Sequence, residues 1–149
     1  MLSIQTDEYY MQQALGEAEQ AYREGEVPVG AIVVCEGQII ARAHNQTERL
    51  KDVTAHAEIL ALTAASQHLG SKYLDKCTLF VSLEPCLMCA GALAWAQLGR
   101  LVYAAADDKR GFMRIGKSAL HPRTEVLYGL MEEEASALLK KFFAEKRKV

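Results

Sequence analysis

The chain has 149 residues, the length of one ordinary domain that can bury a core without disulfides or a structural metal. Half of its residues are hydrophobic and 24% are charged, which excludes disordered, collagen-like and disulfide-rich classes, and a net charge of −2 gives no overall cationic field for a polyanion. No apolar run reaches the roughly 18 residues of a membrane helix and the start lacks a leader pattern, so we expect a cytoplasmic protein without a membrane partner.

The first predicted element is an amphipathic helix over 7–23, where apolar residues recur at three-and-four spacing and Gly25 follows the last turn. Two antiparallel strands are predicted next, VGAIVVC over 29–35 and QIIARAH over 38–44. They are joined across Glu36-Gly37, a pair typical of tight hairpin turns.

Helices and strands then alternate along the chain. A polar loop over 45–54 leads to a predicted helix over 55–70, a strand over 77–83, a helix over 86–99 and a strand over 100–106. This order predicts parallel strands joined by right-handed crossovers, with helices on both faces of the sheet.

The last part of the chain begins with an irregular stretch over 107–123, followed by a short strand over 124–129. A closing helix is predicted over 131–146. Its predicted core side carries Leu138, Leu139, Phe142 and Phe143.

Two short motifs stand at the starts of the two central helices, His56-Ala57-Glu58 and Pro85-Cys86-Leu87-Met88-Cys89. Cysteines three apart on one helix share a face, and a helix N-terminus favours the thiolate that binds metal. Two sulfurs and a neutral imidazole from His56 favour tetrahedral zinc, and three protein ligands leave a fourth position for water. Such an open site indicates catalysis.

Glu58 is the candidate proton carrier of this site. Zinc lowers the pKa of its bound water from about 16 toward about 7, and attack on an amidine-like carbon then leaves two proton transfers to be made. Glu58 can make them only if it does not bind the metal. Residues two apart on a regular helix diverge by about 200°, so His56 must lie at the non-helical edge of the first turn.

Other interpretations of the cysteines remain open at this point. A Cys-x-x-Cys pair at a strand-to-helix junction also describes thioredoxin-like redox sites. A closed structural zinc site would need a fourth ligand, for which Cys77 and His44 are the candidates. Taken individually, Cys35 and Cys77 are interpreted as small buried residues, and His68 as a surface residue at a helix end.

Together the two motifs resemble the signature of the zinc-dependent nucleoside and nucleobase deaminases. With EVPVGAIVV, the His44-Asn45 pair, HAEILAL, LEPCLMCAGAL and LLKKFFAEKRK, the chain is similar to the bacterial tRNA-specific adenosine deaminases over nearly its whole length. The resemblance implies a single zinc-dependent deaminase domain over 1–149, with a three-layer α/β/α cytidine-deaminase-like fold around a central mixed five-stranded sheet. It also implies a homodimer that hydrolyses the wobble adenosine of a tRNA anticodon loop to inosine.

The resemblance also assigns residues. It implies that His56, Cys86 and Cys89 hold one zinc ion per chain and that Glu58 moves the protons. The residues it implies for the substrate pocket and its border are Pro28, Val29, Asn45, Ala57 and Asp107.

The segment after Gly111 departs from the pattern. It reads FMRIGKSALHPRTEV, whereas many relatives continue through small residues and a longer loop. Phe112 could stack on a base, and Lys109, Arg110 and Arg114 could contact phosphates, although packing against a dimer partner would account for the same residues. The second hypothesis is therefore a deaminase of a free base or nucleoside of the guanine, cytosine or cytidine type.

Overall fold

In the computed structural model, which describes residues 5–147, the chain opens with helix α1 (Asp7–Arg23), as the sequence predicted. The Thr6 side chain caps it by accepting the Tyr9 N–H at 3.1 Å. The buried face of α1 consists of Tyr10, Met11, Ala14, Leu15, Ala18 and Ala21.

The hairpin that follows has the predicted turn. Strands β1 (Gly30–Cys35) and β2 (Gln38–His44) pair antiparallel, and Glu36 and Gly37 between them have φ values of +53° and +77°. A two-residue type I′ turn requires positive φ at both positions, and Gly37 adopts such a φ without steric cost.

The other elements complete one mixed sheet of five strands in the order β2-β1-β3-β4-β5. Strand β1 is antiparallel to both neighbours, whereas the last three strands are parallel. Strands β2 and β3, which a helical crossover connects, therefore run in the same direction, with β1 between them. In chain order the remaining elements are α2 (Thr47–Leu50), α3 (Ala57–Leu69), β3 (Cys77–Leu83), α4 (Leu87–Trp95), β4 (Arg100–Ala105), β5 (Glu125–Tyr128) and α5 (Glu132–Arg147).

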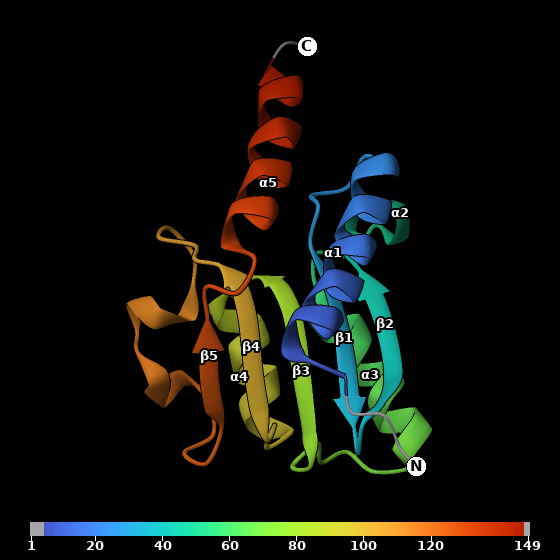
Figure 1. Cartoon of the computed structure of the whole chain (residues 1–149), viewed down its shortest axis with the longest axis vertical. Coiled ribbons are helices and arrows are strands. Elements are labelled where there is room, and N and C mark those ends of the chain that lie inside the picture. Colours follow the sequence, from blue (N-terminus) through green and yellow to red (C-terminus); the bar gives the residue numbers. More distant parts are fainter. Residues whose placement is uncertain (1–4, 148–149) are drawn as a thin grey trace.

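Helices cover both faces of the sheet, as predicted (Figure 1). Helix α1 and the start of α5 pack on one face, against a cluster that includes Ile32, Phe80 and Val102. Helices α3 and α4 pack on the other face, against the strand residues that point the opposite way. The result is the three-layer α/β/α arrangement around a mixed five-stranded sheet that the resemblance implied.

Two local predictions were wrong. The loop over 45–54 contains the one-turn helix α2, and the helix predicted over 86–99 ends at Trp95. It ends there because Gln97 adopts a left-handed conformation, with φ at +56°, in a turn that carries Leu98 into the core.

The predicted core side of α5 was also partly wrong. Phe142 is buried, but Leu138 and Leu139 are half-buried and Phe143 is 43% exposed. Figure 1 shows the physical reason: α5 extends past the end of the sheet, so its last turns have no strand beneath them.

Candidate metal centre and active site

The two sequence motifs meet at one edge of the sheet (Figure 1), where β3 ends and where α3 and α4 begin. The carboxyl ends of parallel strands and the N-termini of the helices that follow them form the usual ligand crevice of such sheets. His56, Cys86 and Cys89 lie here with their ligand atoms all within 4.8 Å of one another.

The three side chains have the spacing of a tetrahedral metal site. The Nδ1 atom of His56 lies 3.6 Å from the Cys86 sulfur and 3.4 Å from the Cys89 sulfur. An ion about 2.3 Å from a sulfur and about 2.0 Å from an imidazole nitrogen separates the two by about 3.5 Å in tetrahedral geometry. The donor set therefore fits a cation that prefers nitrogen and sulfur, as zinc does.

Backbone geometry explains how ligands so close in sequence converge. His56 is the N-cap of α3, in extended conformation with φ −74° and ψ 153°, so the prediction that it lies at the non-helical edge is confirmed. Cys86 is likewise the N-cap of α4 rather than part of its first turn, with φ −71° and ψ 171°. Cys89 lies inside that first turn and is fully buried.

Electrostatics make the group attractive to a cation. A hydrogen bond with Cys89, and a second with His56, lower the pKa of Cys86 to about 4. The hydrogen bond with Cys86, together with burial, raises the pKa of Cys89, and the contact with Cys86 also raises the pKa of His56. A bound cation would take the place of the protons that these groups carry in its absence.

Glu58 lies beside this group on the first turn of α3 and is only 4% exposed. Burial raises the pKa of its carboxyl group to about 7. It faces the same cavity as His56 and Cys86 without belonging to the metal-binding group. A carboxyl group with a pKa near neutrality can both accept and give up a proton.

A cavity of about 690 Å³ opens over these residues, within the usual range for small-molecule sites. Four of the five pocket residues implied by the resemblance line it: Val29, Asn45, Ala57 and Asp107. The fifth, Pro28, is buried and lies between two lining residues, Val27 and Val29, without itself lining the cavity. The Val29 N–H donates to the Val27 carbonyl at 2.8 Å, so Pro28 lies at the centre of a tight turn.

The loop after Asp107 supplies two of the four predicted RNA contacts to the cavity, Lys109 and Arg110. Arg114 is exposed, but its guanidinium donates to the Lys109 carbonyl. Phe112 was predicted wrongly as a base-stacking residue: it is fully buried, with its ring edge-on to Tyr103 at 6.0 Å. Its N–H donates to the Pro85 carbonyl at 2.9 Å, which draws this segment into the core.

Residues that sequence reasoning missed also shape the cavity. Leu139 and Phe143 of α5 line it, which no local pattern could indicate, because α5 reaches the site only through the tertiary fold. Glu84 is buried, and its carboxylate accepts the backbone N–H groups of Asp107 and Met113, each at 3.0 Å. An acidic residue at the end of a buried strand was the available signal for this role.

Neither candidate for a fourth metal ligand joins the group. The His44 ring lies between the carboxylates of Glu17 and Glu24. Cys77 lies opposite Cys35 in the register of β1 and β3, and both are free thiols. Over residues 5–147, the metal-binding group contains three ligand residues and no fourth. The arrangement is that of an open site rather than a closed structural one.

Comparison with known proteins decides between the deaminase and redox interpretations. The sequence profile of the MafB19-like deaminases matches residues 5–147. The chain belongs to this deaminase family. Among curated relatives of the deaminase, a tRNA-specific adenosine deaminase from Aquifex aeolicus is 46% identical over 145 residues, covering 94% of this chain and 95% of the relative.

Solved structures agree with the family. A structure from a study of A-to-I editing by tRNA:A34 deaminases superposes on the deaminase with a TM-score of 0.83 and 41% identity, covering 88% of this chain and 99% of the other. A guanine deaminase from Nitrosomonas europaea also gives a TM-score of 0.83, with 28% identity and coverage of 95% and 87%.

Proposed function

We propose that this deaminase hydrolyses the wobble adenosine of a tRNA anticodon loop to inosine and ammonia. The observation that carries the proposal is the triangle of one nitrogen and two sulfurs, two members of which, His56 and Cys86, line the same cavity as buried Glu58. The choice of tRNA is supported by the 46% identity to the Aquifex aeolicus enzyme and by the likeness to a tRNA:A34 deaminase structure.

His56, Cys86 and Cys89 would hold one zinc ion per chain. Their donor atoms and their separations of 3.4 and 3.6 Å support this choice of metal. Zinc bound there would supply Lewis-acid chemistry that lowers the pKa of water from about 16 toward about 7.

Glu58 performs the proton transfers of the reaction. A C–O bond forms at the purine carbon that carries the amine, and the C–N bond to that amine breaks. Glu58 takes a proton from the attacking water and delivers it to the departing nitrogen, which leaves as ammonia. Asn45, Val29 and Ala57 line the cavity around this carboxyl group and hold the base against it.

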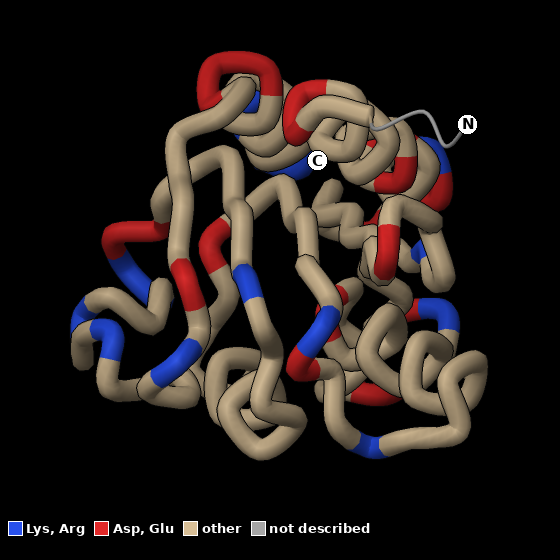
Figure 2. Tube along the Cα trace, turned by 60° about the horizontal axis from the view of Figure 1, so that its bottom comes forward, with Lys and Arg blue, Asp and Glu red and all other residues tan. Residues whose placement is uncertain are grey.

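The substrate base must be unpaired, because its amine cannot be attacked inside a base stack, and an anticodon loop offers such a base at low cost. Lys109, Arg110 and Asp107 line the cavity. In this proposal Lys109 and Arg110 would contact phosphates, Asp107 would border the path of the strand, and Arg114 remains a predicted contact. An adjoining cavity of about 510 Å³ adds Lys140 and Arg147. Figure 2 shows basic and acidic positions interspersed along the chain, so these contacts are local.

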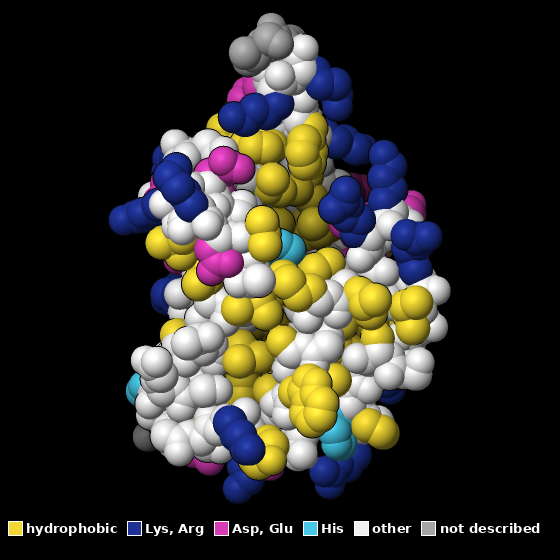
Figure 3. Space-filling view, turned by 180° about the vertical axis from the view of Figure 1, so that it is seen from behind, with side chains coloured by type: hydrophobic (Ala, Val, Ile, Leu, Met, Phe, Trp, Pro, Cys, Tyr) yellow, Lys and Arg dark blue, Asp and Glu magenta, His cyan; other side chains and the backbone are white. Residues whose placement is uncertain are grey.

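We further propose that the enzyme acts as a homodimer in the cytoplasm. Figure 3 shows hydrophobic side chains gathered on the face that α3 and α4 cover. We call the exposed apolar residues of α4 and of the turn after Gly111 the α4 face: Leu87, Met88, Trp95, Met113 and Ile115. Four unpaired thiols suit a reducing compartment, and none of the described helices is long and apolar enough to cross a membrane.

The test is incubation of the zinc-loaded protein with a tRNA that carries adenosine at the wobble position. Sequencing should then show guanosine in place of adenosine at that position and at no other. Guanine, cytosine and cytidine are assayed in parallel for released ammonia, because the likeness to a guanine deaminase favours a free base as the second candidate. Ammonia from a free base without inosine in the tRNA would exclude the proposed substrate.

A further inference from the structure

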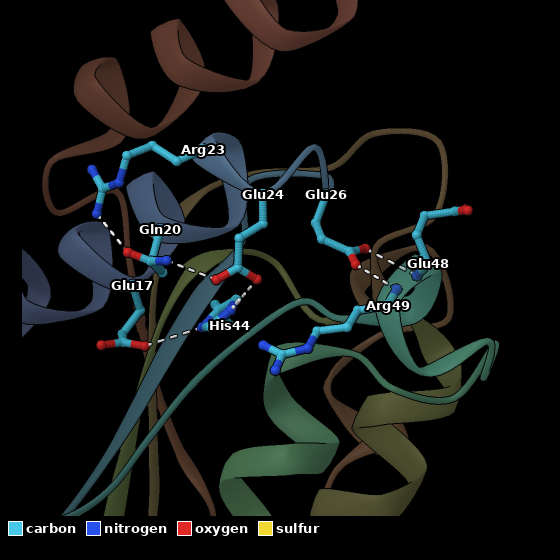
Figure 4. A network of polar contacts seen from close by, with 8 residues as sticks. All are labelled: Glu17, Gln20, Arg23, Glu24, Glu26, His44, Glu48 and Arg49. Carbon is cyan, nitrogen blue, oxygen red and sulfur yellow. Dashed lines mark hydrogen bonds and ion pairs between the residues drawn. The ribbon is translucent and has the colours of Figure 1, made fainter.

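Glu26 is a buried carboxylate that neither the metal group nor the proposed chemistry uses. Its side chain is 1% exposed, and both oxygens accept backbone N–H groups, from Glu48 at 3.1 Å and from Arg49 at 2.8 Å (Figure 4). Its own N–H donates to the Ala21 carbonyl at 2.9 Å, which fixes Glu26 to the end of α1.

The two amides that Glu26 binds are those that a helix cap normally serves. Glu48 and Arg49 are the second and third residues of α2, and an N-cap side chain usually accepts the N–H of one of them. Gln46, the N-cap of α2, makes no such bond with its side chain. Glu26, about twenty residues earlier in the chain, caps α2 in its place.

Little else holds this part of the chain. We call residues 46–55 the α2 excursion, because the chain moves away after β2 and comes back to Gln46 at Ala55, where the Gln46 N–H donates to the Ala55 carbonyl at 3.0 Å. Helix α2 buries none of its residues, and Val53 is 84% exposed. The excursion's only buried apolar residue is Ala55 at its last position, which is 1% exposed. Apart from the bonds to Glu26 and the His56 N–H that donates to the Thr54 carbonyl, its hydrogen bonds lie within residues 46–55.

The α2 excursion forms one wall of the active-site cavity. Thr47 lines the cavity, and so does Asn45, immediately before the excursion. His56, the histidine of the metal group, follows immediately after it. The carboxylate of Glu26 thus fixes the backbone of a segment that lines the cavity in which the nucleotide would bind.

We propose that Glu26 is a positioning residue that fixes the α2 excursion for binding of the RNA substrate. The inference rests on the proposed function. Glu26 does not touch the reacting atoms, so its loss should change KM rather than kcat. A mobile α2 excursion would bind the RNA strand more weakly, while the metal group and Glu58 keep their geometry. Displacement of a positioning element by about 1 Å can cost 10²-fold in rate, and we expect a loss of about 10- to 100-fold in kcat/KM.

The test is Glu26→Gln, which keeps the size of the side chain but turns an amide NH₂ toward a backbone N–H. With an anticodon stem-loop as substrate, KM should rise at least about tenfold and kcat should stay within about threefold. In hydrogen exchange, the amides of Glu48 and Arg49 should exchange at least about tenfold faster, while those of α3 are unchanged. Glu26→Asp, which keeps the charge on a shorter chain, should fall between Glu26→Gln and the wild type.

The matched control is Glu24→Gln. Glu24 lies two residues away in the same network (Figure 4), but its carboxylate contacts only side chains, His44 at 2.9 Å and Gln20 at 2.7 Å. This variant should behave as the wild type in both measurements.

Three results would overturn the inference. They are unchanged exchange at Glu48 and Arg49 in Glu26→Gln, an unchanged KM, or a fall in kcat together with loss of bound zinc. If Glu26→Gln does not fold, Glu26→Asp is judged by the same criteria. A wild type that makes no inosine would refute the proposed function instead, and the exchange measurement would still decide whether Glu26 holds the excursion.

Discussion

Two buried glutamates near the cavity show how surroundings assign a role to the same side chain. Glu26 has both oxygens bound by backbone N–H groups, so its carboxylate is held in one place. Glu58 faces the cavity, and burial raises its pKa to about 7. The first arrangement suits a structural anchor, and the second suits a group that must exchange protons near neutral pH.

We predict that Glu58→Gln keeps the metal and loses the reaction. The amide fills the same space but cannot accept a proton from water, so turnover should fall by at least about 10²-fold. Zinc content by elemental analysis should stay near one per chain, because Glu58 is not part of the metal-binding group. An active Glu58→Gln variant, or one that has lost its zinc, would show that the role is misassigned.

The site residues differ in how far the sequence could predict them. His56, Glu58, Cys86 and Cys89 followed from the chemistry and spacing of two short motifs. The structure brings the first three to one cavity and places buried Cys89 in the same metal-binding group as His56 and Cys86. Phe112 was misplaced for a physical reason. Composition suggests what a side chain could do, but only the packed fold determines whether it faces the cavity or the core.

Elements with a local cause were predicted best. The β1–β2 hairpin has its predicted turn because Gly37 suits the positive φ of a two-residue turn between adjacent strands. Where an element ends for a tertiary reason, the prediction was wrong: α4 stops at Trp95 so that Leu98 can enter the core. The short helix α2 was missed because its cap, Glu26, lies far away in the sequence.

The packing of α1 on β1 depends on the absence of a side chain at Gly30. A Cβ atom there would lie 2.1 Å from the Ala14 carbonyl oxygen and 2.4 Å from the Ala18 nitrogen. We predict that Gly30→Ala lowers the free energy of unfolding by about 1–3 kcal/mol, because helix and strand must move apart. Urea unfolding of the zinc-loaded protein measures the change.

Gly16, on the exposed side of α1, offers the matched control. It is exposed, and a Cβ atom there would have no heavy atom within 4 Å. Gly16→Ala should therefore raise the free energy of unfolding by about 0.5–1 kcal/mol, since alanine loses less backbone entropy in a helix. If both variants had the same free energy of unfolding, close packing of α1 on Gly30 would not explain the effect of Gly30→Ala.

At the scale of the whole molecule, a net charge of −2 is compatible with an RNA substrate because the relevant cations are local. Lys109 and Arg110 line the catalytic cavity, and Lys140 and Arg147 line the adjoining one. The overall charge describes the long-range field, whereas binding of a single loop depends on a few phosphate contacts. Only the fold brings cations from the loop after Asp107 and from α5 to the same place.

The α4 face is the candidate interface of the proposed homodimer. Trp95 is 86% exposed on α4, and a large exposed aromatic residue among other apolar side chains is typical of an interface. We predict that Trp95→Glu shifts the protein from dimer to monomer at micromolar concentration in light scattering. The control is Val53→Glu, which introduces the same charge at a position that is 84% exposed on the α2 excursion and should leave the dimer intact. A wild type that is monomeric, or a Trp95→Glu variant that remains dimeric, would mean that α4 does not form the interface.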